Sequence, residues 1–228
     1  MMQGKQTLVL VPGLLCDREV WSHQEEHLRE SCRIVVPDFS DCSSIAEIFA
    51  CILESAPGEF MLAGHSMGGW LALEILKHHP ERISKLCLLD TTGETDSPSI
   101  TGRRVRMMEG SKLGNIEEVI DGLVQTFVFQ KDAVPAIRAM FLRNQEKFVF
   151  QEELMLARGE SLSGLSRAPL SPLLIVGSED RGFLPSMKTL HNLMPTSRLE
   201  VIQDCGHMTT MEKPREVTSL MRNWIGYP

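Results

Sequence analysis

The sequence of 228 residues contains no long apolar run, no CxxC pair and no cluster of Lys and Arg. The apolar run nearest the N-terminus, Leu8 to Val11, is far shorter than a membrane span or the core of a signal peptide. We therefore expect a cytoplasmic protein without a membrane span. The net charge of −7, with no basic cluster against it, would repel a phosphate backbone, so we expect no nucleic-acid partner.

The six cysteines are scattered along the chain, and no two of them have the spacing of a zinc site. In a reducing compartment we expect free thiols, most of them buried as small hydrophobic side chains. The composition is otherwise that of a soluble globular protein, with 43% hydrophobic and 23% charged residues. A chain of this length fits one domain with a sizeable core, and an inserted lid is compatible with it.

Short apolar runs alternate with helical patterns in both halves of the chain. The runs are continuously apolar, which predicts strands buried on both faces of a parallel sheet, at 7–11, 33–36, 60–63, 85–90, 172–176 and 199–202. Between them, apolar residues recur at three- and four-residue spacing, as in the predicted helices at 45–53 and 70–79. The sequence predicts an α/β fold with a mostly parallel sheet of about six to seven strands flanked by helices.

Residues 94–168 interrupt this alternation, because they carry helical patterns without a strong strand signal. We predict a helical cap at 94–168, inserted into a core made of residues 1–93 and 169–228. Methionines and phenylalanines in this segment would suit either a flexible apolar lid over a substrate or ordinary helix packing. In open α/β sheets ligands bind beyond the carboxyl ends of the strands, and that is where the most informative residues lie.

The segment Gly64-His65-Ser66-Met67-Gly68-Gly69 follows a predicted strand and precedes a predicted helix. A sharp strand-to-helix turn would expose the Ser66 hydroxyl to a base, and small residues at 64 and 68 would permit the strained backbone that this turn needs. This is the nucleophile-elbow pattern G-x-S-x-G in its expected context. The alternative is a glycine-rich turn that happens to contain serine.

Asp180 follows the predicted strand at 172–176, and His207 follows the last predicted strand. Each alone would more often be a surface loop residue. Together with Ser66 they stand in the order Ser, Asp, His, the order of serine hydrolases with an α/β sheet. Asp90 also ends a predicted strand and is the alternative acid, although Gly177-Ser178-Glu179-Asp180 directly after its strand fits better.

An oxyanion in a tetrahedral intermediate needs two N–H donors. We predict the backbone N–H of Met67, just after the nucleophile, and the N–H of Leu14, in the loop that follows the first strand. The alternative for Val11-Pro12-Gly13-Leu14-Leu15 is a plain Pro-Gly turn.

Five segments, taken in order, make the chain resemble the α/β-hydrolase superfamily: LVLVPGLLCDREVW, GHSMGG, HHPERISKLCLLDTTG, PLLIVGSEDRGFLP and CGHMTTMEKP. More narrowly, the chain is similar to small bacterial esterase-like hydrolases. The resemblance implies a helical cap over the pocket. The sequence departs from the family pattern at Pro12-Gly13, where His-Gly is common, in the short loop after Asp38, and in lacking the usual first two strands.

The hypothesis is hydrolysis of a small-molecule carboxylic ester through an acyl-enzyme, with Ser66 as nucleophile, His207 as base and Asp180 orienting the histidine. This chemistry requires no metal ion and no organic cofactor. A thioesterase, a lactonase, a carbon–carbon bond hydrolase or an acyl-transfer enzyme would use the same residues. A non-catalytic ligand receptor on the same fold is the alternative from another class, and a structural protein would have no use for the three reactive side chains. The sequence leaves the natural substrate and the oligomeric state open.

Overall fold

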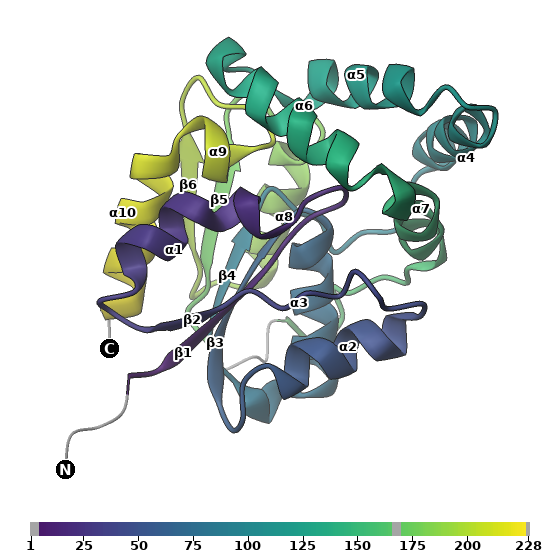
Figure 1. Ribbon diagram of the computed structural model, residues 1–228. Coiled ribbons are helices and arrows are strands. Elements are labelled where there is room, and N and C mark those ends of the chain that lie inside the picture. The colour runs from purple at the N-terminus through teal and green to yellow at the C-terminus, as the bar shows by residue number, and fades with distance from the viewer. Residues whose placement is uncertain (1–4, 166–169, 227–228) are drawn as a thin grey trace.

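A six-stranded parallel sheet forms the centre of the computed structural model, which describes residues 5–165 and 170–226. The strand order is β2-β1-β3-β4-β5-β6 (Figure 1). Every neighbouring pair is parallel. The predicted α/β fold is therefore confirmed. The strands are β1 (Thr7–Val11), β2 (Arg33–Val35), β3 (Phe60–His65), β4 (Ile83–Leu89), β5 (Leu173–Gly177) and β6 (Arg198–Ile202).

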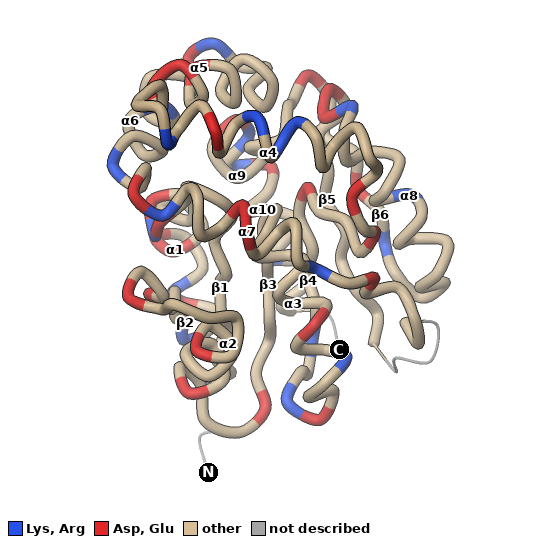
Figure 2. The backbone as a smooth tube through the Cα atoms, turned by 90° about the vertical axis from the view of Figure 1, so that its right-hand side faces the viewer, with Lys and Arg blue, Asp and Glu red and all other residues tan. Residues whose placement is uncertain are grey.

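Alternate side chains of the central strands β1, β3, β4 and β5 enter two separate hydrophobic cores, which explains the continuously apolar strand sequences. Leu8 and Leu10 of β1 face one core, and Val9 and Val11 face the other. The first core packs against α1 (Ser22–Leu28) and α10 (Pro214–Gly226), and the second against α2 (Ile45–Glu54), α3 (Met67–His78) and α8 (Leu184–Leu193). Charged residues gather on helices and loops, and the strands are mostly free of them (Figure 2).

The chain begins its sheet at β1, places β2 on one side and then crosses to place β3 on the other. After β1 the chain continues to α1 on one face of the sheet, and after β3 it continues to α3 on the other face. The two loops therefore run in opposite directions and leave a crevice at the carboxyl ends of these strands, where ligands bind in such sheets. Gly13 and Leu14 follow β1 at this point, and Ser66 follows β3.

Among the described residues, four α-helices lie between β4 and β5, and we call Pro98–Ala157 the helical insertion. They are α4 (Pro98–Lys112), α5 (Ile116–Phe127), α6 (Val134–Arg143) and α7 (Phe148–Ala157). In Figure 1 the insertion lies beyond the carboxyl ends of the strands. The predicted boundary between residues 168 and 169 lies outside the described residues, as do residues 1–4. Among the described residues, no helix is long and apolar enough to span a membrane.

Buried ion pairs join helices of the insertion to each other and to the segments that flank it. Arg104 of α4 binds Glu152 of α7 at 2.6 Å and Asp96 at 2.7 Å. Arg158, just after α7, binds the other oxygen of Asp96 at 2.6 Å. Because these groups have little contact with water, each charge depends on its partners to offset the cost of desolvation.

Candidate active site

Ser66 lies at the sharp turn between β3 and α3, with φ 55° and ψ −119°. Its N–H donates to the carbonyl of Leu89 at 2.9 Å, which ties the turn to β4. A Cβ at Gly64 would lie 2.2 Å from the carbonyl oxygen of Gly68, and a Cβ at Gly68 would lie 2.2 Å from that of Val11. Glycine is therefore required at both positions for the turn to approach β1 and its own helix so closely.

His207 joins Ser66 to Asp180 in one chain of contacts. Its Nε2 lies 2.8 Å from Oγ of Ser66, and its Nδ1 lies 2.7 Å from Oδ2 of Asp180. The Asp180 side chain is 5% exposed and the His207 side chain 2%. Three loops at the ends of β3, β5 and β6 thus bring a hydroxyl, an imidazole and a carboxylate into line, the arrangement that activates a serine hydroxyl in a triad.

Two aromatic rings fix the imidazole of His207 in addition to its hydrogen bonds. The ring of Phe127 lies 4.5 Å from that of His207, and the ring of Phe183 lies 4.4 Å from it, between centroids. The N–H of His207 donates to the carbonyl of Phe127 at 2.7 Å. Phe127 ends α5, so the insertion itself contributes to the position of His207. A Cβ at Gly206 would lie 2.3 Å from the carbonyl oxygen of Phe127, which explains the glycine before His207.

Asp90, the alternative acid, is buried completely but does not contact the imidazole of His207. One of its carboxylate oxygens accepts from the Thr209 hydroxyl, and the other accepts from the N–H of Gly177 at 3.1 Å. Burial raises the pKa of Asp90 well above its usual value, and the negative charge of Asp180 raises it further. Asp90 therefore ties the loops after β4 and β5 to Thr209, and the contact to His207 is made by Asp180.

His65, which precedes Ser66, is buried and contacts the backbone of His207. Its Nε2 lies 2.8 Å from the carbonyl oxygen of His207. Burial, helped by the nearby His207, lowers the pKa of His65 from 6.5 to about 3. The ring is neutral near pH 7, and because a carbonyl only accepts, Nε2 carries the proton.

The predicted oxyanion donors, Leu14 and Met67, both line the cavity that contains Ser66 and His207. Met67 begins α3, so its N–H belongs to the first turn of that helix, where backbone N–H groups have no partner within the helix. Leu14 belongs to a turn in which the N–H of Cys16 donates to the carbonyl of Gly13 at 3.1 Å.

The cavity at Ser66 has a volume of about 40 Å³ and lies between the core and the insertion. Its apolar wall includes Trp70, Met107, Leu123, Phe141 and Met155. Arg103 of α4 lines this cavity and also a neighbouring cavity of about 390 Å³, which reaches Asp180 and Phe183. Within residues 5–165 and 170–226, no group of three or more His, Cys, Asp or Glu side chains is placed to hold a metal ion.

Two polar residues at this site gave no signal in the sequence. Glu212, in α9 (Thr209–Glu212), accepts from the N–H of Met208 at 3.1 Å and from the N–H groups of Phe129 and Gln130 at 2.8 and 2.7 Å. It thereby binds the end of α5 to the loop of His207. Gln151 of α7 accepts from the N–H of Leu15 at 2.8 Å. Both contacts join segments far apart in the chain, and no local motif marks them.

Comparison with known proteins gives the class of this chain. The model of the α/β hydrolase family matches residues 8–220, so the chain belongs to the α/β hydrolase family. It is 30% identical, over 93% of its length and 87% of the relative, to a putative 2-succinyl-6-hydroxy-2,4-cyclohexadiene-1-carboxylate synthase of Bacillus subtilis (strain 168). It is 27% identical to a 2-hydroxymuconate semialdehyde hydrolase of Pseudomonas putida, over 72% of this chain and 61% of that protein.

Solved structures agree with this family. A thermophilic esterase from Thermogutta terrifontis, with malate bound, has a TM-score of 0.85 and 25% identity, over 97% of this chain and 90% of that one. An enol-lactonase from Burkholderia xenovorans LB400 shares the fold, with a TM-score of 0.84 and 16% identity over 99% and 93% of the two chains.

Proposed function

We propose that the protein is a serine hydrolase that cleaves a small-molecule carboxylic ester through an acyl-enzyme. The observation that carries this proposal is the continuous contact from Asp180 through His207 to Ser66, with distances of 2.7 and 2.8 Å. Membership of the α/β hydrolase family and the likeness to an esterase support it. A receptor would have no need for a buried carboxylate that orients an imidazole toward a hydroxyl.

The reaction has two steps. Oγ of Ser66 bonds to the ester carbonyl carbon while Nε2 of His207 takes the hydroxyl proton, and the N–H groups of Leu14 and Met67 stabilise the oxyanion. His207 then returns the proton to the leaving alcohol as the carbon–oxygen bond breaks. A water molecule, deprotonated by His207, attacks the acyl-enzyme, and the carboxylic acid leaves as Ser66 recovers its proton. Asp180 holds His207 in the required tautomer throughout.

Covalent labelling with a fluorophosphonate, followed by assays with p-nitrophenyl esters of increasing acyl length, tests this function. We expect labelling and turnover in the wild type, and neither in Ser66→Ala with its fold intact. Ser99→Ala is the matched control, because Ser99 is exposed on α4. Equal hydrolysis by purified Ser66→Ala, or a well-folded wild type that is neither labelled nor active on any ester, contradicts the proposal.

A second candidate is a reaction that uses Ser66, His207 and Asp180 on a substrate that carries a carboxylate. It would be either cleavage of a carbon–carbon bond or the reaction for which the Bacillus subtilis relative is named. The position of Arg103 favours it, because this cation lines both cavities. Among the described residues, the guanidinium of Arg103 makes no ion pair, unlike that of Arg104. One relative is named as the synthase of a cyclohexadiene carboxylate, and the esterase structure contains bound malate. Both compounds are carboxylates, which is consistent with an anionic substrate.

Paired substrates test whether Arg103 binds a carboxylate, as the second candidate requires. If a carboxylate binds at Arg103, monomethyl succinate should be hydrolysed with a lower KM than methyl butyrate, and Arg103→Gln should raise only the first KM. Equal KM values for the two esters in wild type and variant would exclude a role for Arg103 in binding an anion.

A further inference from the structure

The loop that follows β1, residues Gly13 to Asp17, is attached to the helical insertion by polar contacts at two points. Oε1 of Gln151, in α7, accepts from the N–H of Leu15 at 2.8 Å, and this contact is buried. At the other end of the loop, Oδ2 of Asp17 accepts from Nη2 of Arg143 and from Nδ2 of Asn144, each at 2.8 Å.

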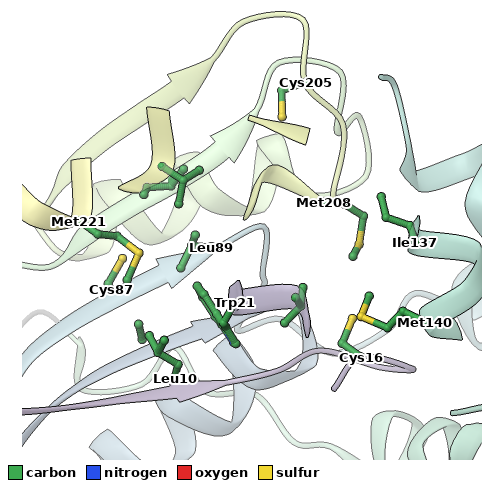
Figure 3. Packing of buried hydrophobic residues seen from close by; sticks show 14 of the residues in the cluster. Leu10, Cys16, Trp21, Cys87, Leu89, Ile137, Met140, Cys205, Met208 and Met221 are labelled. Carbon is green, nitrogen blue, oxygen red and sulfur yellow. The ribbon is translucent and has the colours of Figure 1, made fainter. Parts of the chain in front are cut away.

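An apolar contact lies between these polar ones. Cys16 and Met140 of α6 belong to the same hydrophobic core. Figure 3 shows their side chains next to each other where the insertion meets the core, with Ile137 and Met208 close by. Residues 15, 16 and 17 therefore all contact the insertion. The polar pairs are far apart in the sequence, by 136 residues for Leu15 and Gln151 and by 126 for Asp17 and Arg143.

The backbone of this loop is strained at Leu15, which has φ 58°. A leucine in the left-handed region costs free energy that a glycine would not, so surrounding contacts must hold it there. The turn is closed by the hydrogen bond from the N–H of Cys16 to the carbonyl of Gly13. Leu14 and Leu15 are its two central residues, and the N–H of Leu15 is bound by Gln151.

We propose that Gln151 is a positioning residue for the oxyanion hole. This inference rests on the proposed function. By binding the N–H of Leu15, Gln151 fixes the peptide group that joins Leu14 to Leu15 and keeps the strained turn in place. The direction of the Leu14 N–H is thereby set, and this group is one of the two donors to the oxyanion. A donor aligned in advance stabilises the transition state more than the bound substrate.

The central test compares Gln151→Ala with Gln151→Glu, which keeps an acceptor oxygen. Gln145→Ala is the matched control, since Gln145 lies in the same insertion, in the short turn Gln145–Lys147. For Gln151→Ala we expect kcat to fall by about 10- to 100-fold, below the loss for complete removal of an oxyanion donor, with KM changed by less than about threefold. Gln151→Glu should recover most of kcat, and Gln145→Ala should match the wild type.

A trifluoromethyl ketone separates positioning from a structural role, because it forms a tetrahedral adduct with the serine and places an oxyanion in the hole. Its Ki should rise by the same factor as kcat falls, whereas the KM of the ester should not. A folded Gln151→Ala with wild-type kcat and Ki overturns the proposal. So does a loss of kcat that Gln151→Glu does not recover in folded protein.

Two further measurements keep the test decisive if Gln151→Ala does not fold or if no ester is hydrolysed. Asp17→Ala removes the more exposed attachment and should lower kcat in the same direction but by a smaller factor. Hydrogen–deuterium exchange of the Leu15 amide does not require turnover, and it should be faster in Gln151→Met, which has a side chain of similar size without an acceptor oxygen, than in the wild type. An unchanged rate means that Gln151 does not restrain the loop, whereas a wild type that fails labelling contradicts the proposed function alone.

Discussion

The imidazole of His65 donates from Nε2 to the backbone carbonyl of His207 at 2.8 Å, so the residue before the proposed nucleophile holds the residue proposed as its base. Both rings are buried, and their centroids lie 5.3 Å apart. The hydrogen bond crosses from the end of β3 to the loop after β6. It joins the two loops whose separation sets the distance between Ser66 and His207.

The lowered pKa of His65 makes stability depend on pH in a defined window. The unfolded chain binds a proton at this residue below about pH 6.5, whereas the native protein does so only near its pKa of about 3. The contribution of His65 to stability is therefore complete above pH 6.5 and is lost as the pH falls toward 3, at up to about 1.4 kcal/mol per pH unit.

His65→Gln should remove this dependence, because glutamine can donate to the carbonyl of His207 without titrating. We expect the free energy of unfolding in urea, measured from pH 7 to pH 4, to fall less steeply for the variant than for the wild type. Oδ2 of Asp90 lies 3.8 Å from Nε2 of His65, so the comparison is repeated in the Asp90→Asn background, where this carboxylate does not contribute. Parallel curves would show that His65 does not titrate differently in the two states.

Replacement of each acidic residue by asparagine distinguishes Asp180 from Asp90. Asp180→Asn should lower kcat by about 10⁴-fold, the size of the same change in another serine triad, because the imidazole loses the carboxylate that sets its tautomer. Asp90→Asn should lower kcat by less than about tenfold, since Asp90 contacts Thr209 and Gly177 and not the His207 ring. Steady-state ester hydrolysis measures both. A larger loss in Asp90→Asn would reverse the assignment.

Replacement by alanine should change the free energy of unfolding in opposite directions at Gly68 and Gly122. A Cβ at Gly68 would lie 2.2 Å from a backbone oxygen of Val11, which cannot move without disturbing β1. Gly68→Ala should therefore lower the free energy of unfolding by about 3 kcal/mol or more. Gly122, within α5, has nothing within 4 Å of the position of a Cβ. Gly122→Ala should raise the free energy of unfolding by about 1 kcal/mol, because alanine favours the helix. Urea denaturation measures both.

The buried ion pairs of the insertion should matter far more than an exposed pair. Arg104→Met leaves the carboxylate of Glu152, which is 1% exposed in its side chain, without its partner. We expect a loss of about 3 to 5 kcal/mol, measured by urea denaturation. Arg138→Met removes a contact to Asp121 at 2.6 Å between side chains that are 36% and 47% exposed, and should cost far less, because water screens an exposed pair. Similar losses in the two variants would contradict this account.

The sequence by itself determined the strands and the turn at Ser66, because both depend on local chemistry. A strand whose alternate residues enter two cores must be apolar throughout, as in 7–11, and a sharp turn that touches neighbouring backbone must have glycine at 64 and 68. The six strands begin and end within about two residues of the predicted ranges. The differences lie at strand ends in both directions: β3 continues two residues past its predicted range, whereas β2 ends one residue before the end of its own. Hydrogen bonding to the neighbouring strand, and not apolarity alone, sets where a strand ends.

Only the tertiary structure decided which acid contacts His207 and how the helical insertion reaches the site. Asp90 and Asp180 both follow buried strands, and these strands are neighbours in the sheet. The loop after β6 lies beside the end of β5, where the N–H of Glu179 donates to the carbonyl of Cys205 at 2.9 Å, and this places His207 against Asp180. The contact of Gln151 with Leu15 likewise depends on where α7 lies relative to the loop after β1, since groups 136 residues apart meet only through the packing of the whole chain.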